Sequence, residues 1–172
     1  KKISLCNSGI IAGKSKQLFN MLNLVKNKNA KREYYLTDIV GIARKKGLKV
    51  GLIEAPEDEV MGINSPEELA EANAIFQRKI RLKFLRQGVS MHDPNSVWFS
   101  YDTKIGRNVT IGPNVFFGKN VRIDTDVTID SFCHMEGVTV GKNSSIGPFS
   151  RLRAKTRIAA NVHIGSFVEI KN

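Results

Sequence analysis

The stretch IGRNVT IGPNVF FGKNVR IDTDVT IDSFCH, residues 105–134, decides the fold, because an apolar residue returns at every sixth position. The register then slips by one residue, and VGKNSS IGPFSR LRAKTR IAANVH IGSFVE, residues 140–169, repeats the pattern. The apolar residues that keep this period are Ile105, Ile111, Phe117, Ile123, Ile129, Met135, Val140, Ile146, Leu152, Ile158, Ile164 and Ile170. The next position is mostly glycine or an acidic residue, and the fourth after each is mostly Val, Ser, Thr or Cys.

A six-residue period matches neither the 3.6-residue period of a helix nor the two-residue period of a strand. It predicts a coil of short strands joined by tight corners, in which each apolar residue stacks on its equivalent one turn later. We therefore expect a parallel β-helix of about four turns, with the small residue after each apolar one at the corner. The last hexad ends at Asn172 without a capping element, and we expect the sequence to be cut there.

Residues 1–66 alternate short apolar runs with helical patterns, as α/β folds do. Strands are expected over residues 3–11 and 48–53, and helices over 15–25 and 37–46, with Gly47 ending the second helix. A longer helix is expected to begin with Ser65 as its cap, Pro66 in its first turn and Glu68 completing a capping box, and to end at Gly88. Three parts follow: residues 1–66, a linker helix over 67–88, and the coil over 89–172.

The composition argues against a nucleic-acid-binding, membrane-inserted, disulfide-rich or zinc-binding protein. The hydrophobic content of 41% and charged content of 25% are those of a soluble globular protein. The net charge of +11 is spread along the whole chain without a basic block, so we do not expect nucleic-acid binding. No apolar run approaches the roughly 20 residues that a membrane helix needs, so we expect no membrane insertion and a cytoplasmic location. Cys6 and Cys133 are too few for a disulfide framework or a zinc site, and both are expected to be buried thiols.

Three ordered segments carry a family resemblance. They are NSGI at residues 7–10, NA at 29–30 with EYYLTDI at 33–39, and IGPFSRLR at 146–153 with FVEIK at 167–171. Together they resemble the bacterial bifunctional N-acetylglucosamine-1-phosphate uridyltransferase and glucosamine-1-phosphate acetyltransferase. The resemblance implies an internal piece of that enzyme: the end of a Rossmann-like nucleotidyltransferase domain, a joining helix and the first turns of a left-handed β-helix.

The same resemblance implies two binding residues in the first part of the chain. Asn7 matches a residue of the sugar-nucleotide pocket, and a carboxamide both donates to and accepts from sugar hydroxyls. Asn64 matches a ligand of the Mg2+ ion that bridges the phosphates, where a neutral oxygen suits a hard cation. The alternatives are a turn asparagine for Asn7 and a spacer before the helix for Asn64.

Two more binding residues are implied in the coil. Arg153 and Lys171 match residues that bind the phosphorylated sugar, for which Arg offers a fork of donors and Lys a point charge. Arg153 also stands at a position where the repeat prefers Gly or Asp, and such departures favour a functional role. The alternative is a pair of solvated charges on the outside of the coil.

The implied function is synthesis of UDP-N-acetylglucosamine, a precursor of peptidoglycan and lipopolysaccharide, by uridylyl transfer from UTP and acetyl transfer from acetyl-coenzyme A. The family's nucleotide loop and catalytic histidine do not occur in this sequence, so we assign no catalytic residue and expect no activity from this chain alone. His163 should point outward and not replace that base. The family also implies a homotrimer. A non-catalytic trimeric assembly module, or a remnant that only binds sugar nucleotides, is the alternative function.

Overall fold

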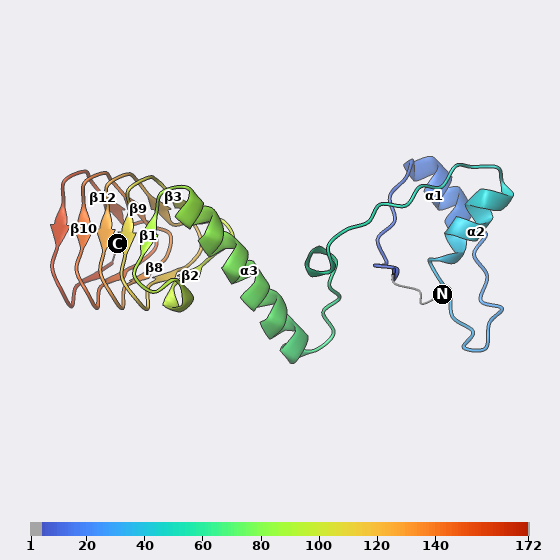
Figure 1. Ribbon diagram of the computed structural model, residues 1–172, viewed down its shortest axis with the longest axis horizontal. Helices are drawn as coiled ribbons and strands as arrows, with labels where there is room; N and C mark the ends of the chain where they lie inside the picture. The colour runs from blue at the N-terminus through green and yellow to red at the C-terminus, as the bar shows by residue number, and fades with distance from the viewer. Residues whose placement is uncertain (1–4, 172) are drawn as a thin grey trace. The chain divides into compact units, whose positions relative to one another are not determined.

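The computed structural model describes residues 5–171, which divide into two compact units, residues 5–68 and residues 69–171 (Figure 1). The second unit is a parallel β-helix whose turns stack along one axis, as the six-residue period predicts. Its two-residue strands are β1 (Ser90–Met91), β2 (Trp98–Phe99), β3 (Lys104–Ile105), β4 (Thr110–Ile111), β5 (Phe116–Phe117), β6 (Arg122–Ile123), β7 (Thr128–Ile129), β8 (His134–Met135), β9 (Thr139–Val140), β10 (Ser145–Ile146), β11 (Arg151–Leu152), β12 (Arg157–Ile158), β13 (His163–Ile164) and β14 (Glu169–Ile170).

Every third strand along the chain belongs to the same sheet, so the coil has three flat faces. The sheets have the orders β1-β4-β7-β10-β13, β2-β5-β8-β11-β14 and β3-β6-β9-β12, with parallel pairing throughout. We call them faces A, B and C. Each predicted periodic residue is the second residue of a strand, and most of them are completely buried, which confirms the period as the origin of the core. The small residues before each strand, such as Val121 and Cys133, fill the rest of the interior.

Glycine follows the core residues of the repeat for a different structural reason from the one we expected. We predicted that they form the corner, but the residues with positive φ come two positions later, at Asn108, Asn114 and Asn120 for example. Asparagine tolerates that conformation because its short polar side chain bonds locally. The glycines allow close stacking instead: a Cβ on Gly147 would lie 2.6 Å from the backbone of Gly165 one turn later.

The slip in the repeat is a corner shortened by one residue. Most turns pair residues 18 apart, as in Phe99 with Phe117, whereas Met135 pairs with Leu152, 17 residues later. Gly137 occupies the positive-φ position of this corner, at φ 60°, and a Cβ there would meet Ala154 at 2.9 Å. Only glycine meets both demands.

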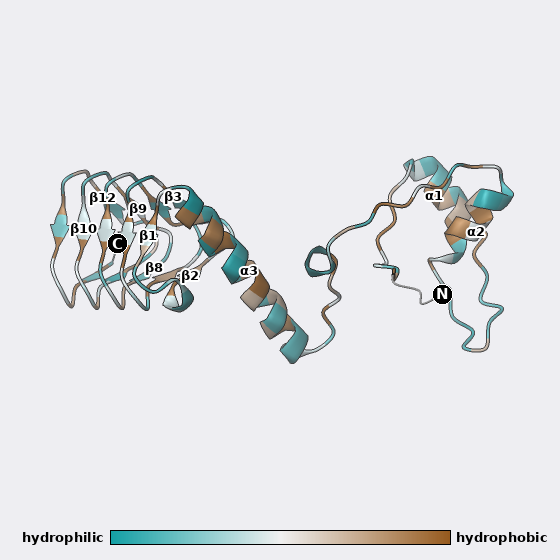
Figure 2. Ribbon diagram, in the orientation of Figure 1, coloured by the Kyte–Doolittle hydropathy of each residue, from teal (hydrophilic) through white to brown (hydrophobic). Residues whose placement is uncertain are grey.

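The α3 helix (Pro66–Arg86) covers the first turn of the coil. Its start confirms the predicted capping box, since the Glu68 amide donates to Ser65 Oγ and the Ser65 amide donates to Glu68 Oε2, each at 3.1 Å. Gly88 follows its end at φ 90°. Polar and apolar residues alternate along the helix (Figure 2), and its buried residues are Gln77, Ile80 and Phe84.

Gln77 and Arg81 close the open edge of the coil with hydrogen bonds. The Gln77 side chain donates to the Phe99 carbonyl at 2.7 Å and accepts from the Phe99 amide at 3.0 Å, as a neighbouring strand would. Arg81 Nε donates to the Val97 carbonyl at 2.8 Å. Phe84 adds an apolar contact, with its ring centroid 4.9 Å from that of Phe99. Arg81 therefore binds the coil and is not simply a solvated charge on the outside of the helix.

The first unit confirms its predicted helices but not its strands. α1 (Ser15–Leu22) and α2 (Asp38–Lys45) pack through Met21, Ile39 and Ala43, and Gly47 follows α2 at φ 72°. A short 3-10 helix, η1, spans Glu57–Glu59, and another, η2, spans Pro94–Ser96 in the second unit. The strand expected over residues 48–53 does not form, and Ile53 is 94% exposed.

The other expected strand, residues 3–11, lies partly outside the described residues, and residues 5–11 form no strand either. A strand needs a partner for its backbone N–H and C=O groups. Among residues 5–68 no segment pairs with either of the two expected strands, residues 5–11 or residues 48–53. The α/β prediction for residues 1–66 therefore holds for its helices only. Cys6 lies in this unpaired segment and is exposed, so its predicted burial is wrong, whereas Cys133 is buried. Within residues 5–171 no helix is both long and apolar enough to cross a membrane.

Candidate functional site

The structure brings Arg153 and Lys171 together at one edge of face B. Each follows the inward residue of its strand, Leu152 in β11 and Ile170 in β14, and those strands pair in parallel, so the two side chains lie one turn apart. The Arg153 amide donates to the Ile170 carbonyl at 3.1 Å, which fixes the two backbones in register. The sequence period therefore places both cations on the same surface.

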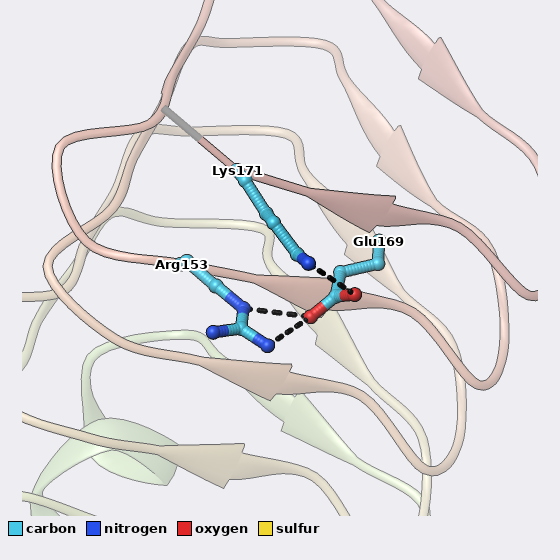
Figure 3. Close-up of polar contacts among 3 residues, drawn as sticks. All are labelled: Arg153, Glu169 and Lys171. Atoms are coloured by element: carbon cyan, nitrogen blue, oxygen red, sulfur yellow. Dashed lines mark hydrogen bonds and ion pairs between the residues drawn. The ribbon is translucent and has the colours of Figure 1, made fainter.

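Glu169, which sequence analysis did not single out, joins the two cations (Figure 3). Its Oε1 accepts from Arg153 Nε at 2.6 Å and is also paired with the Arg153 Nη2 atom, and its Oε2 lies 3.6 Å from Lys171 Nζ. Side-chain exposures of 44%, 39% and 62% for Arg153, Glu169 and Lys171 leave the group open to solvent. A small anion can therefore reach both cations. We call these three residues the cationic cluster.

The hydrogen bond from Arg153 lowers the pKa of the Glu169 carboxyl, and the charges of Arg153, Lys171 and Arg151 add to this. A depressed pKa in the folded state means that the pairing stabilises the fold above the pKa of the unfolded chain and is lost as pH falls through the folded pKa. Glu169 thus stays ionised at neutral pH and occupies the position between the cations.

We expect Arg153→Met to raise the pKa of Glu169 toward that of an ordinary glutamate, because the largest cause of its depression is removed. An NMR titration of the Glu169 side-chain carboxyl checks this. Arg157→Met on face C is the matched control and should leave the pKa unchanged. An unaltered Glu169 pKa in Arg153→Met would show that the pairing does not hold in solution.

A shallow hollow adjoins the cluster. Its lining residues are His134, Glu136, Arg151, Leu152, Arg153 and Ala154. Partial burial and the nearby Arg151 charge lower the pKa of His134, while Glu136 opposes the shift. His134 therefore loses its proton more readily than a free histidine, and the positive charge of this surface comes from its arginines and lysine.

Asn7 and Asn64 are both exposed and belong to the first unit, whereas the cationic cluster belongs to the second. Asn7 Oδ1 accepts from the Gly9 amide at 3.1 Å, which is the turn interaction considered as the alternative to a sugar contact. The Asn64 amide donates to Glu68 Oε2, so its backbone takes part in capping α3. Among the described residues, its carboxamide makes no hydrogen bond.

The described residues do not make a magnesium site on their own. Mg2+ takes six ligands in near-ideal octahedral geometry, and proteins supply mostly carboxylate oxygens. Asn64 offers one neutral oxygen, and the neighbouring Glu68 carboxylate caps the helix. No group of three or more His, Cys, Asp or Glu side chains converges to hold a metal within residues 5–171. Asn64 alone cannot hold the ion.

Two other chemically active side chains lie away from the cluster. His163 is exposed on face A, and its Nδ1 lies 2.6 Å from Ser145 Oγ. Cys133 points into the core, where its Sγ donates to the Gly147 carbonyl at 3.1 Å and burial raises the pKa of its thiol. Its neighbour His134 points outward, so the two do not share a metal. The thiol therefore ionises less readily than that of a free cysteine.

Comparison with known proteins identifies relatives along the whole chain. The family model described as "Bacterial transferase hexapeptide (six repeats)" matches residues 137–172. The bifunctional protein GlmU of Cereibacter sphaeroides is 49% identical over 172 residues, covering 100% of this chain and 38% of that protein. The GlmU proteins of Paramagnetospirillum magneticum and Paracoccus denitrificans are 47% and 45% identical and cover 97% and 100% of this chain.

The chain thus spans about two fifths of the length of these relatives, 38%, 37% and 39% respectively. Among solved structures, the acetyltransferase domain of PglB from Neisseria gonorrhoeae with acetyl coenzyme A covers 58% of this chain at 19% identity, with a TM-score of 0.29.

Proposed function

Because the chain belongs by sequence to the family of bifunctional GlmU proteins, we propose that it contributes to the two transferase reactions that lead to UDP-N-acetylglucosamine. Its coil binds the sugar phosphate for acetyl transfer from acetyl-coenzyme A to glucosamine-1-phosphate. Residues 1–66 serve the transfer of a uridylyl group from UTP to N-acetylglucosamine-1-phosphate, with Asn7 at the sugar and Asn64 as one ligand of a shared Mg2+ ion. Copies of the chain assemble as a trimer.

The observation that carries this proposal is the cationic cluster. Arg153 and Lys171 lie one turn apart on an open surface and already share an anion, the Glu169 carboxylate. A phosphate carries more charge and more acceptor oxygens than a carboxylate, so it competes for the Arg153 fork and the Lys171 point charge. The displaced Glu169 carboxylate is then free to accept a hydrogen bond from the sugar amine or a hydroxyl.

The chain's own residues thus bind and orient the sugar phosphate in the acetyl transfer. Arg153 and Lys171 hold the phosphate end, and the hollow beside Arg151 and Leu152 receives the sugar ring. Orientation of this kind raises the rate by holding the amine where the acetyl group arrives. We assign no proton-accepting group in this chain, and its activity alone is not expected.

Isothermal titration of the 172-residue chain with glucosamine-1-phosphate, and with glucosamine as the ligand that lacks phosphate, tests the proposal. We expect binding that requires the phosphate and that weakens at least about tenfold in Arg153→Ala, since a charge-assisted fork is lost. Arg157→Ala, which changes an exposed arginine on face C, should bind as wild type does. Absence of phosphate-dependent binding, or equal loss in both variants, would favour the non-catalytic assembly module.

A further inference from the structure

One turn of the coil presents a positive charge at every second residue, in the segment RLRAKTR at residues 151–157. Its exposed cations are Arg151, Arg153, Lys155 and Arg157. Between them, Leu152 and Thr156 are buried. Arg151 is the outward residue of β11 on face B and Arg157 that of β12 on face C, so the segment wraps around the edge between these two faces. We call the four cations the basic belt.

The basic belt is a short arc around the edge and not a row along the coil. The equivalent residues one turn earlier carry no lysine or arginine: His134, Glu136, Gly137 and Thr139. One turn later, Glu169 pairs with Arg151 and Lys171 follows at the level of Arg153. A long polyanion needs cations repeated along its path. A small ligand that carries several negative charges suits the belt better.

Lys155 stands in a backbone conformation that lysine does not favour. Its φ is 71°, and the equivalent corners of the two preceding turns have Gly137 and Asn120, which tolerate positive φ. The corner geometry therefore does not call for lysine at this position. A residue that breaks a local preference in this way is expected where function requires its side chain.

The charges of the belt are balanced unequally. Glu169 pairs with Arg153, whereas within residues 5–171 neither Lys155 nor Arg157 forms an ion pair. Successive cations of the belt are two residues apart, so their Cα atoms are separated by no more than about 7 Å. Like charges this close repel each other, and an anion bound between them removes that repulsion.

The belt is continuous with the cationic cluster, because Arg153 belongs to both. A monophosphate on Arg153 and Lys171 leaves Lys155 and Arg157 unused. In a diphosphate, the second phosphoryl group is joined to the first through a single oxygen atom, so it lies within reach of the flexible Lys155 side chain. Arg157 adds a fork of donors on the same side of the edge.

We propose that the basic belt binds the second phosphoryl group of a diphosphate through Lys155 and Arg157, while Arg153 and Lys171 bind the first. The inference rests on the proposed function for the first phosphate, and it extends that site to inorganic pyrophosphate and to nucleoside diphosphates. Uridylyl transfer from UTP releases pyrophosphate and forms a diphosphate ester. A product of one proposed reaction thus competes with the sugar phosphate of the other, because both ligands need Arg153.

Isothermal titration of the 172-residue chain with inorganic pyrophosphate, in magnesium-free buffer, tests the belt. We expect the wild type to bind pyrophosphate at least about tenfold more tightly than inorganic phosphate. Lys155→Asn should weaken pyrophosphate binding at least about tenfold and keep the affinity for glucosamine-1-phosphate within about twofold. Asparagine suits the positive φ, as Asn120 does, so circular dichroism should show an unchanged fold.

Lys142→Asn is the matched control. Lys142 is an exposed lysine in the corner between faces C and A, so this variant should bind pyrophosphate as the wild type does. Uridine diphosphate distinguishes the two sources of the group. Binding tighter than that of pyrophosphate, and weakened by Lys155→Asn, identifies a nucleotide ester as the ligand, whereas equal or weaker binding identifies pyrophosphate; either result supports the site.

The outcomes separate the belt from the proposed function. Pyrophosphate that binds no more tightly than phosphate, or equally to wild type and Lys155→Asn, overturns the belt while binding of glucosamine-1-phosphate still supports the proposed function. Pyrophosphate binding that depends on Lys155, without binding of glucosamine-1-phosphate, supports the belt and contradicts the sugar-phosphate site. A single-stranded oligonucleotide that binds more tightly than either diphosphate overturns the choice of a small ligand.

Discussion

Gly147→Ala is expected to lower the free energy of unfolding by about 2–4 kcal/mol, as overpacking against a rigid backbone does. The new Cβ would lie 2.6 Å from the carbonyl carbon and oxygen of Gly165 and 2.9 Å from the Ile164 carbonyl oxygen. These atoms belong to the next turn and are held by its sheet, since the Gly147 amide donates to the Ile164 carbonyl at 2.8 Å. The two turns must separate to make room, which weakens that bond and the core contact beneath it.

Gly165→Ala is the matched control, because a Cβ there meets nothing within 4 Å and its backbone needs no positive φ. Its effect should stay within about 0.5 kcal/mol. Urea denaturation followed by circular dichroism measures both variants. Equal losses in the two would mean that glycine is used for flexibility and not for the close approach of the turns.

Gln77→Leu should destabilise the coil by about 2–5 kcal/mol, because it leaves the buried amide and carbonyl of Phe99 without partners. Leucine fills a similar volume, so the loss reports the hydrogen bonds and not a cavity. Gln87→Leu, an exposed site just beyond the same helix, should change stability by less than about 0.5 kcal/mol. Denaturant unfolding again provides the measurement.

Gln77→Glu gives an independent check through pH. A carboxylate still accepts from the Phe99 amide but repels its carbonyl, whereas the protonated acid donates as glutamine does. Burial raises the pKa of such a carboxyl, so the variant should regain stability relative to wild type as pH falls through that pKa. A constant difference between the two proteins at all pH values would contradict the strand-like role of Gln77.

The coil could be predicted from sequence because its period is set by packing of one residue on its equivalent, as Ile111 and Ile129 illustrate. The packing of α3 over the open edge of the coil could not be predicted, because burial of Gln77 depends on where the helix meets the edge of β2. The apolar spacing along the helix does not distinguish Ile80 and Phe84, which are buried, from Leu69 and Phe76, which are 49% and 39% exposed. A buried polar residue such as Gln77, which bonds to two backbone groups, is not detected by a pattern of apolar residues.

The strands expected in the first unit failed for a related reason. Apolar residues at 48–53 satisfy a strand's local preferences, but a strand also needs a neighbouring segment to pair with, and no segment among residues 5–68 pairs with them. In the site, Arg153 and Lys171 were identified by family resemblance. Glu169 could have been found by arithmetic: once a turn is 18 residues, it lies above Arg151 and beside both cations.

The shortened corner at Gly137 has a consequence for how such a coil tolerates changes in length. A residue lost at a corner, outside the ladder of backbone bonds, leaves every later side chain on its original side, as the unbroken order of inward residues from Val140 to Ile170 demonstrates. The same loss inside a two-residue strand would exchange inside for outside in all turns that follow. A change of length at a corner should therefore be tolerated, because it preserves the alternation of inward and outward positions that places Arg153 and Lys171 on a common face.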